Sequence, residues 1–440
     1  MVMFGRVTVG RERGINHDHS KTGSSMTTAR QVRRRRLLTA TGGFTVALIF
    51  AGGLAACGSS KSSGSPSTSS SGSSAPSGTT ITIGVVSSDT APSGYSSQVP
   101  TTTAIWQNWI NSHGGIAGHQ VKVLEQDDKN DPALSTSIVD TYIGDHVVAI
   151  IDDSNVDGAW AKQVTAANIS VICAAASGNG FTCSSQPDFV PTGNTVIAGV
   201  YGQAKAAQVA GAKSFGVLYA GEEAAAAQAI PLQKSFSTQV GIKFGYSSSI
   251  LATSPNYTAQ CLAAKEAGVQ ALFPEEAVAQ VATNCAAQGY HPLYVQAQGA
   301  VYSAYKNNPL FNGSVGVIGI FPWWSATNPG IQEFQQAFSK YKPELDAFTT
   351  PYTVMETWDA LQLVATAAAK VPASPSATDI TSGIYSLPAG FTLNGLIPPE
   401  TLVQGKSHTN PCFYILGIRN GQYALPYGTQ PFCQPGVTAQ

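Results

Sequence analysis

From residue 79 onward, short apolar runs rich in β-branched residues alternate with longer amphipathic or alanine-rich stretches. Runs such as VVAII at 147–151 are apolar without alternation, which indicates strands covered on both faces, as in a parallel sheet between helix layers. This order predicts βαβ units. The first series of expected strands is 80–86, 121–126, 147–151 and 170–173, and the helices between them are 101–112, 132–143 and 158–167.

A second series of the same kind follows. Its expected strands are 214–219, 243–250, 269–273 and 293–296, with helices at 196–210, 222–239, 257–267 and 275–288. Two successive series of similar length predict an α/β chain of two lobes, each with its own parallel sheet. The tail adds an expected strand at 315–321, helices at 331–341 and 352–371, and a hairpin that turns at Asn420-Gly421.

The N-terminal region lacks this pattern and has the layout of a bacterial lipoprotein signal. Arg33 to Arg36 form a positive n-region, 37–50 an apolar h-region, and Leu54-Ala55-Ala56 lead up to Cys57 as a cleavage box. We expect residues 1–56 to comprise an extension and this signal, with Met26 as the start, and Cys57 to carry lipid that anchors the chain on the outer face of a membrane. A transmembrane helix is the alternative, and Sec and twin-arginine export both stay open.

The amino-acid composition and charge limit the kinds of molecule that the chain is expected to bind. Residues 58–78 are almost entirely Ser, Gly, Pro and Thr, which predicts a disordered tether after Cys57. The formal net charge is -1 and only 11% of the 440 residues are charged. Nucleic acid or an anionic membrane surface would require a basic patch, so both are disfavoured as partners. Phosphate-loop and nucleophile-elbow signatures are absent, and the calcium-like run 153–158 lacks the acid that should stand at Val164. We therefore expect no catalytic residue, no cofactor and no metal.

The chain has seven cysteines, and the six that remain beside the lipidated one suit an oxidising compartment. Proximity predicts three local disulfides, although six cysteines allow many other connectivities. A zinc site is disfavoured because no two cysteines stand two to four residues apart. The predicted pairs are Cys173 with Cys183, Cys261 with Cys285, and Cys412 with Cys433.

Four motifs come in a fixed order: the strand 80–86, the Pro/Gly loop 92–95 with Tyr95, the glycine-rich turn 111–118, and the acidic run 127–132, whose Asp131-Pro132 can start a helix. In this order the chain resembles the solute-binding proteins of ABC importers, in the branch that binds leucine, isoleucine, valine and amides. The resemblance implies the type I periplasmic-binding-protein fold, with two Rossmann-like lobes, a hinge and a ligand cleft. It implies lobe 1 at 79–194 plus 319–370 and lobe 2 at 195–318 plus 371–440.

The resemblance also implies ligand contacts from loops at the carboxyl ends of strands. In the first lobe these are the aromatic Tyr95, the hydroxyl of Ser154 for a carboxylate, and the run Ala175-Ala176-Ser177 in place of Ala-Ala-Thr. For each serine, an ordinary helix cap is the alternative.

In the second lobe, Gln298 stands where amino-acid-binding relatives have a Glu for the solute's ammonium. Either another carboxylate replaces that Glu or the solute lacks this charge. Glu275 is the first substitute by position and Glu222 the second, and a solvated acid at a helix start is the alternative for both. Trp323 and Trp324 suit a larger apolar, aromatic or cationic solute, with one of the two in interface packing.

The function implied by the resemblance is that of a monomeric, lipid-anchored extracytoplasmic binding protein. It captures a small organic solute, such as an amino acid, an amide or a related carboxylate, by hinge closure and delivers it to ABC permease subunits. A ligand-sensing receptor component with the same fold is one alternative. An exported α/β enzyme is another, and the sequence offers it no nucleophile and base.

Overall fold

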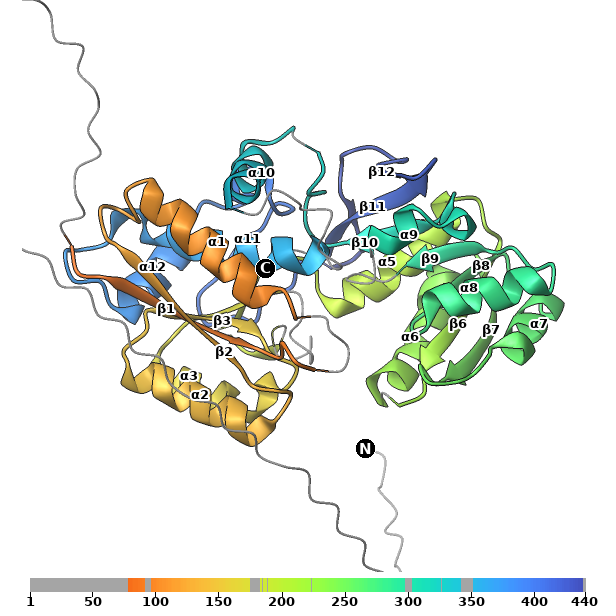
Figure 1. The fold of residues 1–440 in the computed structure, drawn as a ribbon, viewed down its shortest axis with the longest axis horizontal. Helices are drawn as coiled ribbons and strands as arrows, with labels where there is room; N and C mark the ends of the chain where they lie inside the picture. The colour runs from red at the N-terminus through yellow and green to blue at the C-terminus, as the bar shows by residue number, and fades with distance from the viewer. Residues whose placement is uncertain are drawn as a thin grey trace, which may run out of the picture. The chain divides into compact units, whose positions relative to one another are not determined.

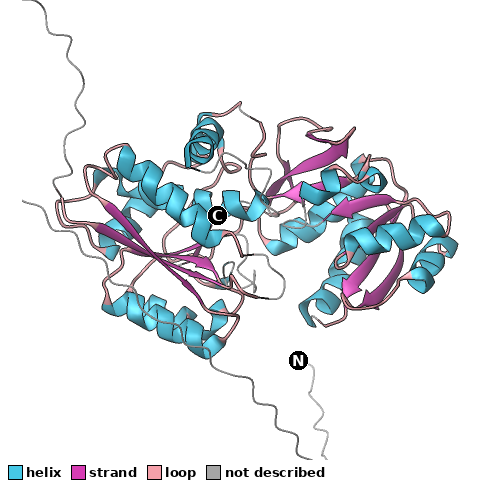
Figure 2. Ribbon diagram, viewed as in Figure 1, coloured by secondary structure: helices cyan, strands magenta, loops and turns pink. Residues whose placement is uncertain are grey.

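The chain forms two β-sheets, each covered by helices on both faces. Figure 1 colours the elements by residue number and Figure 2 by type. The computed structural model describes residues 78–91, 96–174, 183, 185–187, 189–222, 224–296, 303–325, 327–341 and 351–437.

The first sheet has five parallel strands in the order β2-β1-β3-β4-β5. Its central strands are buried on both faces: all five residues of β3 and six of the seven in β1 are buried. This confirms the expectation drawn from the unbroken apolar runs. The strands are β1 (Ile81–Ser87), β2 (Val121–Asp127), β3 (Ala149–Asp153), β4 (Val171–Cys173) and β5 (Phe189–Pro191).

Helices cover both faces of this sheet (Figure 2). On one face α1 (Val99–Ser112) and α11 (Pro351–Ala367) pack on β1 and β3 in one apolar core, and on the other α2 (Pro132–Gly144) and α3 (Ala161–Ala167) form a second core. Alternate residues of β3 therefore face different helices. Ala149 and Ile151 belong to the core of α11, whereas Ile150 belongs to that of α2.

The local motifs form as the sequence predicts. Gly114, Gly115 and Gly118 all have positive φ, and a Cβ at Gly115 would lie 1.8 Å from the carbonyl oxygen of His119. The Asp131 carboxylate accepts from the backbone N–H groups of Ala133 and Leu134, at 2.8 and 3.2 Å. It thus caps α2, with proline in the first turn.

The second sheet has eight strands in the order β12-β11-β10-β9-β8-β6-β7, and β13 pairs with β11. Strands β6 to β10 run parallel, but β11 runs antiparallel to β10, so this sheet is mixed rather than purely parallel. The expected hairpin at Asn420-Gly421 joins β11 to β12. The strands are β6 (Ser214–Ala220), β7 (Lys243–Ile250), β8 (Ala271–Pro274), β9 (Leu293–Gln296), β10 (Val315–Ile318), β11 (Cys412–Arg419), β12 (Gln422–Ala424) and β13 (Phe432–Cys433).

Helices also cover both faces of the second sheet. One core joins its strands to α5 (Val196–Val209) and α6 (Ala224–Gln239), and another joins them to α7 (Thr258–Glu266) and α8 (Val278–Ala287). A short α9 (Ser303–Lys306) precedes β10. All three predicted disulfides are confirmed: Cys173–Cys183 after β4, Cys261–Cys285 between α7 and α8, and Cys412–Cys433 between β11 and β13.

The chain passes between the two sheets in segments that contact one another. After β5 the chain enters α5 through Gly193, Asn194 and Thr195, and after β10 it leaves the second sheet at Gly319. The N–H of Thr195 donates to the carbonyl of Asn410, just before β11, at 3.1 Å. The predicted strand at 315–321 ends earlier, at Ile318, because the chain turns out of the sheet there toward α10 (Pro329–Tyr341).

Helix α12 (Ala377–Tyr385) was not predicted, although Ser376 and Asp379 form a capping box. Its core residues Ile380 and Ile384 pack with α11 and the first sheet. Thr381 also hydrogen-bonds Ser170, which precedes β4, at 2.8 Å. The division into lobes at residue 370 stays a prediction, and these contacts favour attaching α12 to the first lobe.

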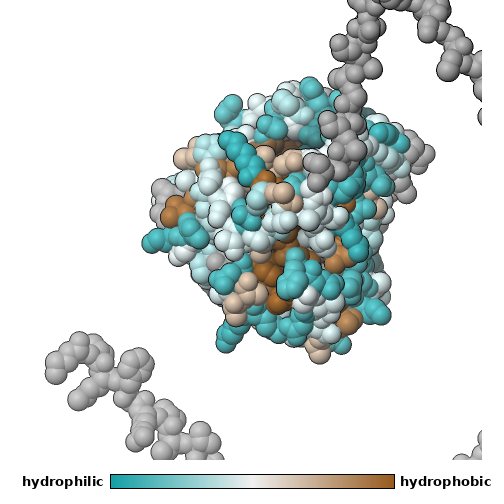
Figure 3. Space-filling view, turned by 90° about the vertical axis from the view of Figure 1, so that its left-hand side faces the viewer, coloured by the Kyte–Doolittle hydropathy of each residue, from teal (hydrophilic) through white to brown (hydrophobic). Residues whose placement is uncertain are grey.

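The face at the left of Figure 1 carries hydrophilic side chains with small hydrophobic patches between them, as Figure 3 shows. Within the described ranges, no helix is both long and apolar enough to cross a membrane. The predicted signal, Cys57 and the tether lie outside those ranges.

Candidate functional site

Strand order reverses between β1 and β3 in the first sheet, and this is where open α/β sheets offer a crevice at their carboxyl ends. The loops after the two strands are joined here. The N–H of Ser88 donates to the carbonyl of Asp153 at 3.3 Å, and the N–H of Asn155 donates to the Ser88 hydroxyl at 3.0 Å. We call the residues at the ends of β1, β2 and β3 and directly after them the carboxyl edge of the first sheet.

Ser154, the predicted carboxylate contact, lies at this edge and is fully buried. Its hydroxyl donates to the Asp128 carboxylate at 2.5 Å and accepts from the N–H of Val156 at 3.0 Å. Both bonds are local and stabilise the turn after β3. The ligand role of Ser154 stays a prediction, and these bonds favour the alternative structural role.

Asp153, one residue earlier, has a hydrogen-bond acceptor atom without a partner, unlike Ser154. It is fully buried, and its Oδ2 accepts from the Thr357 hydroxyl of α11 at 3.2 Å, while Oδ1 has no hydrogen-bond partner. Burial raises the pKa of Asp153 to about 7, Thr357 lowers it in part, and the charge of Glu125 adds to the rise.

Glu356, on α11 beside Thr357, is a second buried acid near Asp153. Its Oε2 has no hydrogen-bond partner, and burial holds its pKa well above the usual range, with smaller contributions from Asp153 and Asp359. Asp359, one turn further along α11, is also fully buried, and burial raises its pKa.

Acidic residues also lie shortly after β1 and at the end of β2. Burial, then the neighbouring Glu125, raises the pKa of Asp89 to about 8. Glu125 in turn accepts from the Ser87 hydroxyl at 2.9 Å. Asp127 is more exposed and accepts from the Thr90 hydroxyl at 2.7 Å. The carboxyl edge of the first sheet is therefore acidic, and every charge that acts on Asp153, Glu356 or Asp89 is that of another acid.

In the second sheet the order reverses at β6, which pairs with both β7 and β8. Glu275, directly after β8, accepts from the N–H of Ala220 at the end of β6, at 2.9 Å, so it lies at this switch point. Glu222 lies on the surface, accepts from the N–H of Ala252 at 3.0 Å, and has a lowered pKa because of that bond. Their roles toward a ligand stay predictions.

The two tryptophans pack with the hairpin rather than with the carboxyl edge. Trp323 is buried, and its ring meets that of Trp324 edge-on at 4.8 Å. The half-buried Trp324 stacks on Tyr423 of β12, with ring centroids 5.0 Å apart. Tyr423 pairs with Ile418 of β11, and the neighbouring Gly417 pairs with Val315, the first residue of β10. Tyr423 therefore lies near the amino end of β10, away from the carboxyl ends of the strands where ligands bind. The contacts thus favour a packing role for both tryptophans.

Several predicted residues lie outside the described ranges, and nothing tests their roles: Tyr95, Ala175, Ala176, Ser177 and Gln298. The acids missed by sequence reasoning are those of the carboxyl edge and of α11. For Asp153 a signal exists, because it ends an unbroken apolar strand. Glu356 and Asp359 give no such signal, since they lie within a helix far along the chain.

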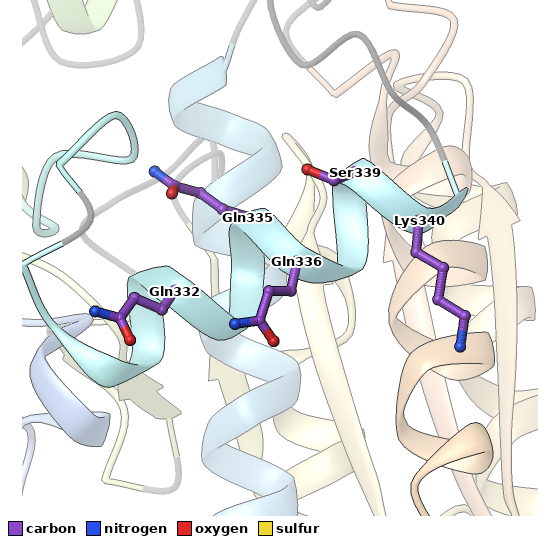
Figure 4. A pocket seen from close by; sticks show the side chains of 5 residues that line it. All are labelled: Gln332, Gln335, Gln336, Ser339 and Lys340. Carbon is purple, nitrogen blue, oxygen red and sulfur yellow. The ribbon is translucent and has the colours of Figure 1, made fainter.

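A hollow of about 510 Å³ lies along α10, and polar side chains of that helix alone line it: Gln332, Gln335, Gln336, Ser339 and Lys340. In Figure 4 these side chains point in different directions instead of converging on one point. The Gln335 amide donates to the carbonyl of Trp323 at 2.8 Å. None of the predicted site residues lines this hollow.

Within the described ranges, no group of three or more His, Cys, Asp and Glu side chains is placed to hold a metal ion. Two helix-covered sheets, each with polar groups at its switch point and joined by crossing segments, define a two-lobed α/β binding protein.

The comparisons with known proteins agree with this class. The sequence profile of the family described as "Periplasmic binding protein" matches residues 80–422, and the chain belongs to this family. Its members are binding proteins rather than enzymes, and membership implies an extracytoplasmic location. No curated protein sequence matches the chain.

Solved structures show the same type I fold. A fatty acid ABC transporter substrate-binding protein from Thermomonospora curvata is 17% identical, with a TM-score of 0.65 over 81% of this chain and 93% of that one. A leucine binding protein, LivK, from Thermotoga maritima is 14% identical, with a TM-score of 0.64 over 81% and 99%. LivJ from Streptococcus pneumoniae, a branched-chain amino acid transporter substrate binding protein in complex with isoleucine, is 16% identical, with a TM-score of 0.64 over 81% and 100%.

Proposed function

We propose that this chain is the lipid-anchored solute-binding protein of an ABC importer, which captures one small organic solute and delivers it to the permease. The observation that carries the proposal is the family match over 80–422, which spans both sheets. The acidic carboxyl edge of the first sheet and Glu275 of the second supply the polar groups that a solute requires.

We infer a hinge at the crossing segments. A Cβ built at Gly193 would lie 3.5 Å from the carbonyl oxygen of Gly319, so the two segments touch where neither carries a side chain. A few such residues can absorb the dihedral changes of domain closure. The lobes that close are the predicted ones, with the refinement that α12 moves with the first lobe.

The contacts proposed for the solute are the predicted ones at these edges. They are Glu275, Tyr95, Gln298 and the run 175–177. The ring packing of the two tryptophans and the local hydrogen bonds of Ser154 and Glu222 favour structural roles for those residues. The structure adds Asp153 to the proposed contacts because its Oδ1 lacks a partner.

Thermal shift and calorimetry on residues 58–440 test the proposal. The panel should contain amino acids, their amides and fatty acids, since proteins of the same fold bear names with leucine, isoleucine and fatty acid. One solute should bind with a stoichiometry of one per chain and raise the melting temperature, because a ligand at 100 times its Kd stabilises the native state by about 2.7 kcal/mol. If every solute leaves the melting temperature unchanged, the proposal is wrong.

The lipid anchor needs a separate test. In a bacterial host that processes lipoproteins, the full chain should fractionate with membranes, and mass spectrometry should find lipid on an N-terminal Cys57. Cys57→Ala should release the protein from the membrane fraction while its solute binding stays intact. A wild-type chain that is soluble after export would contradict the anchor but not the binding function.

A further inference from the structure

This inference concerns the crossing segments and rests on the hinge proposed together with the solute-binding function. We propose that Tyr352 and Glu356 of α11 form a proton-dependent latch on the hinge. The latch holds the crossing segments while the Glu356 carboxyl group is protonated and releases them when this group ionises. Lobe motion would then respond to the acidity outside the cell, since membership of the family implies an extracytoplasmic location. We call the two side chains the hinge latch.

The hinge latch contacts both crossing segments at their glycines. The N–H of Gly319, directly after β10, donates to the Tyr352 hydroxyl at 3.2 Å. Glu356 Oε1 lies 3.7 Å from the position that a Cβ would take at Gly193, shortly after β5. Tyr352 and Glu356 are hydrogen-bonded to each other and lie one turn apart on the same side of α11. One helix therefore contacts the two segments where their backbones touch.

Helix α11 belongs to the first lobe. Met355, Trp358 and Leu361 are fully buried in the core that also contains β1 and β3, and the Thr357 hydroxyl donates to Asp153 at the end of β3. The hinge latch thus ties the crossing segments to the first sheet. Lobe rotation about the two glycines would turn the Gly319 N–H, so this motion competes with the hydrogen bond to Tyr352.

The Glu356 carboxyl group is suited to the protonated form in this arrangement. It is only 2% exposed, and its Oε2 has no hydrogen-bond partner. A buried carboxylate that lacks donors is costly, whereas the neutral acid loses much less on burial. Burial accordingly holds the pKa of Glu356 well above its usual range, and the hydrogen bond to Tyr352 lowers it only in part. Ionisation therefore favours an arrangement in which water reaches this group.

The groups that face Glu356 supply no counter-charge. The charges of Asp153 at the end of β3 and of Asp359 on α11 both raise its pKa, and no basic side chain is among the groups that shift it. The crossing segments at 192–195 and 318–321 contain no titratable side chain. Solvent is then the main source of stabilisation for an ionised Glu356, and it becomes available when the crossing segments move away.

The direction of the pH effect follows from proton linkage. The latched state binds the proton more tightly than a released state, in which a hydrated Glu356 has an ordinary pKa of about 4.3. Between that value and the raised pKa of the latched state, each pH unit favours release by up to about tenfold. The latch is therefore complete at low pH and is lost as the pH rises through the raised pKa.

Small-angle X-ray scattering of the ligand-free protein between pH 5 and pH 9 tests the latch. The radius of gyration of the wild type should shift across this range, because release changes the populations of the lobe arrangements. Glu356→Gln keeps the size of the side chain without the charge, so it should keep the wild-type pH 5 value throughout. Tyr352→Phe removes the hydroxyl that holds Gly319, so it should show the wild-type pH 9 value already at pH 5.

The opposite behaviour of these two variants separates a latch from a merely structural role, in which both would shift the radius of gyration in the same direction. The matched controls are Glu266→Gln and Asp145→Asn, which remove exposed acids at the end of α7 and just after α2. Both should follow the wild type at every pH. Either latch variant can overturn the proposal by itself, so the test stands if the other one does not fold.

Hydrogen exchange of the Gly319 amide gives an independent readout, because this N–H is the donor to Tyr352. After correction for the intrinsic exchange rate, its protection in the wild type should fall as the pH rises, by up to about tenfold per pH unit. In Glu356→Gln the protection should not depend on pH.

The outcomes separate this proposal from the binding function. If the wild-type radius of gyration is the same at pH 5 and pH 9, or if Glu356→Gln keeps the pH dependence, the latch is wrong. In the second case another buried acid is responsible, such as Glu400, whose pKa burial raises to about 8. None of these measurements needs a solute. A panel in which nothing binds overturns the binding function alone, and a latch that fails leaves that function standing.

Discussion

At Gly319 the two crossing segments come so close that a side chain would not fit. A Cβ there would lie 2.0 Å from Oδ1 and 2.6 Å from the backbone nitrogen of Asn194. Gly319→Ala should therefore destabilise the protein by about 1–3 kcal/mol, because backbone atoms must move. Urea unfolding measures this change.

Gly144→Ala is the matched control for that substitution. A Cβ at Gly144, in α2, meets nothing within 4 Å and its φ is not positive. Alanine there should be neutral or stabilise by about 0.4–1 kcal/mol. If the two substitutions have equal effects, the close approach at Gly319 is not the cause.

The buried acids predict how stability depends on pH. The pKa of Asp153 is raised to about 7, so between the unfolded value near 4 and pH 7 the folded state holds a proton that the unfolded state has released. Stability is then greatest at low pH and falls as pH rises through this window, by at most about 1.4 kcal/mol per pH unit for one proton.

Denaturant titrations of the ligand-free protein between pH 4 and pH 8 measure this slope. Asp153→Asn should make it shallower and should raise the free energy of unfolding at pH 8, while Asp145→Asn should keep the wild-type slope. An unchanged slope in Asp153→Asn would place the proton uptake elsewhere, for example at Glu356, whose pKa is also raised.

At the candidate site, the sequence predicts some residue roles correctly and not others. The sequence correctly places polar residues after β3, and Asp131 is the helix cap that the motif predicts. It selects the Ser154 hydroxyl as a contact for a solute carboxylate, which stays a prediction, whereas in the structure Ser154 donates to Asp128 and the atom without a partner is Asp153 Oδ1. The two residues are adjacent, and only the strand register and the facing helix decide which side chain is satisfied.

At the scale of elements, one disulfide joins two helices on the same face of the second sheet. Cys261 in α7 and Cys285 in α8 are 24 residues apart and lie within the apolar core of that face. The double substitution Cys261→Ala/Cys285→Ala should lower the free energy of unfolding by about 3 kcal/mol, because the bond restricts the unfolded chain. Thermal or urea unfolding measures this loss.

Reductant provides the control for this comparison. With all disulfides reduced, the variant and the wild type should converge to within about 1 kcal/mol, since only the packing of two small side chains then differs. A difference that persists in reductant would assign the effect to packing in this core rather than to the covalent bond.

Element types were well predicted from periodicity, and their ends and partners less so. Strand β7 has the predicted bounds, Lys243–Ile250. The strand at 315–321 was predicted too long, since Ile320 and Phe321 are apolar but belong to the core beside α11 rather than to the sheet. Apolar character shows that a residue is buried, and it does not show against which element.

At the scale of the whole molecule, the proposed hinge predicts compaction. The solute that raises the melting temperature should also lower the radius of gyration of residues 58–440 in small-angle X-ray scattering, because closure brings the two sheets together around it. A solute from the same panel that does not bind is the control. An unchanged radius of gyration with a saturating ligand would contradict hinge closure and leave binding itself intact.

By itself, the sequence determined the class of fold, most of the order of strands and helices and the helix cap at Asp131, because these depend on periodicity and neighbouring residues, and its cysteine spacing favoured the three disulfide pairs that the structure has. Tertiary structure alone decided that α11 brings Glu356 and Thr357 to the end of β3, some 200 residues earlier in the chain. It also decided that Trp324 stacks on Tyr423. Such contacts join distant segments through packing, and no local pattern in the chain records them.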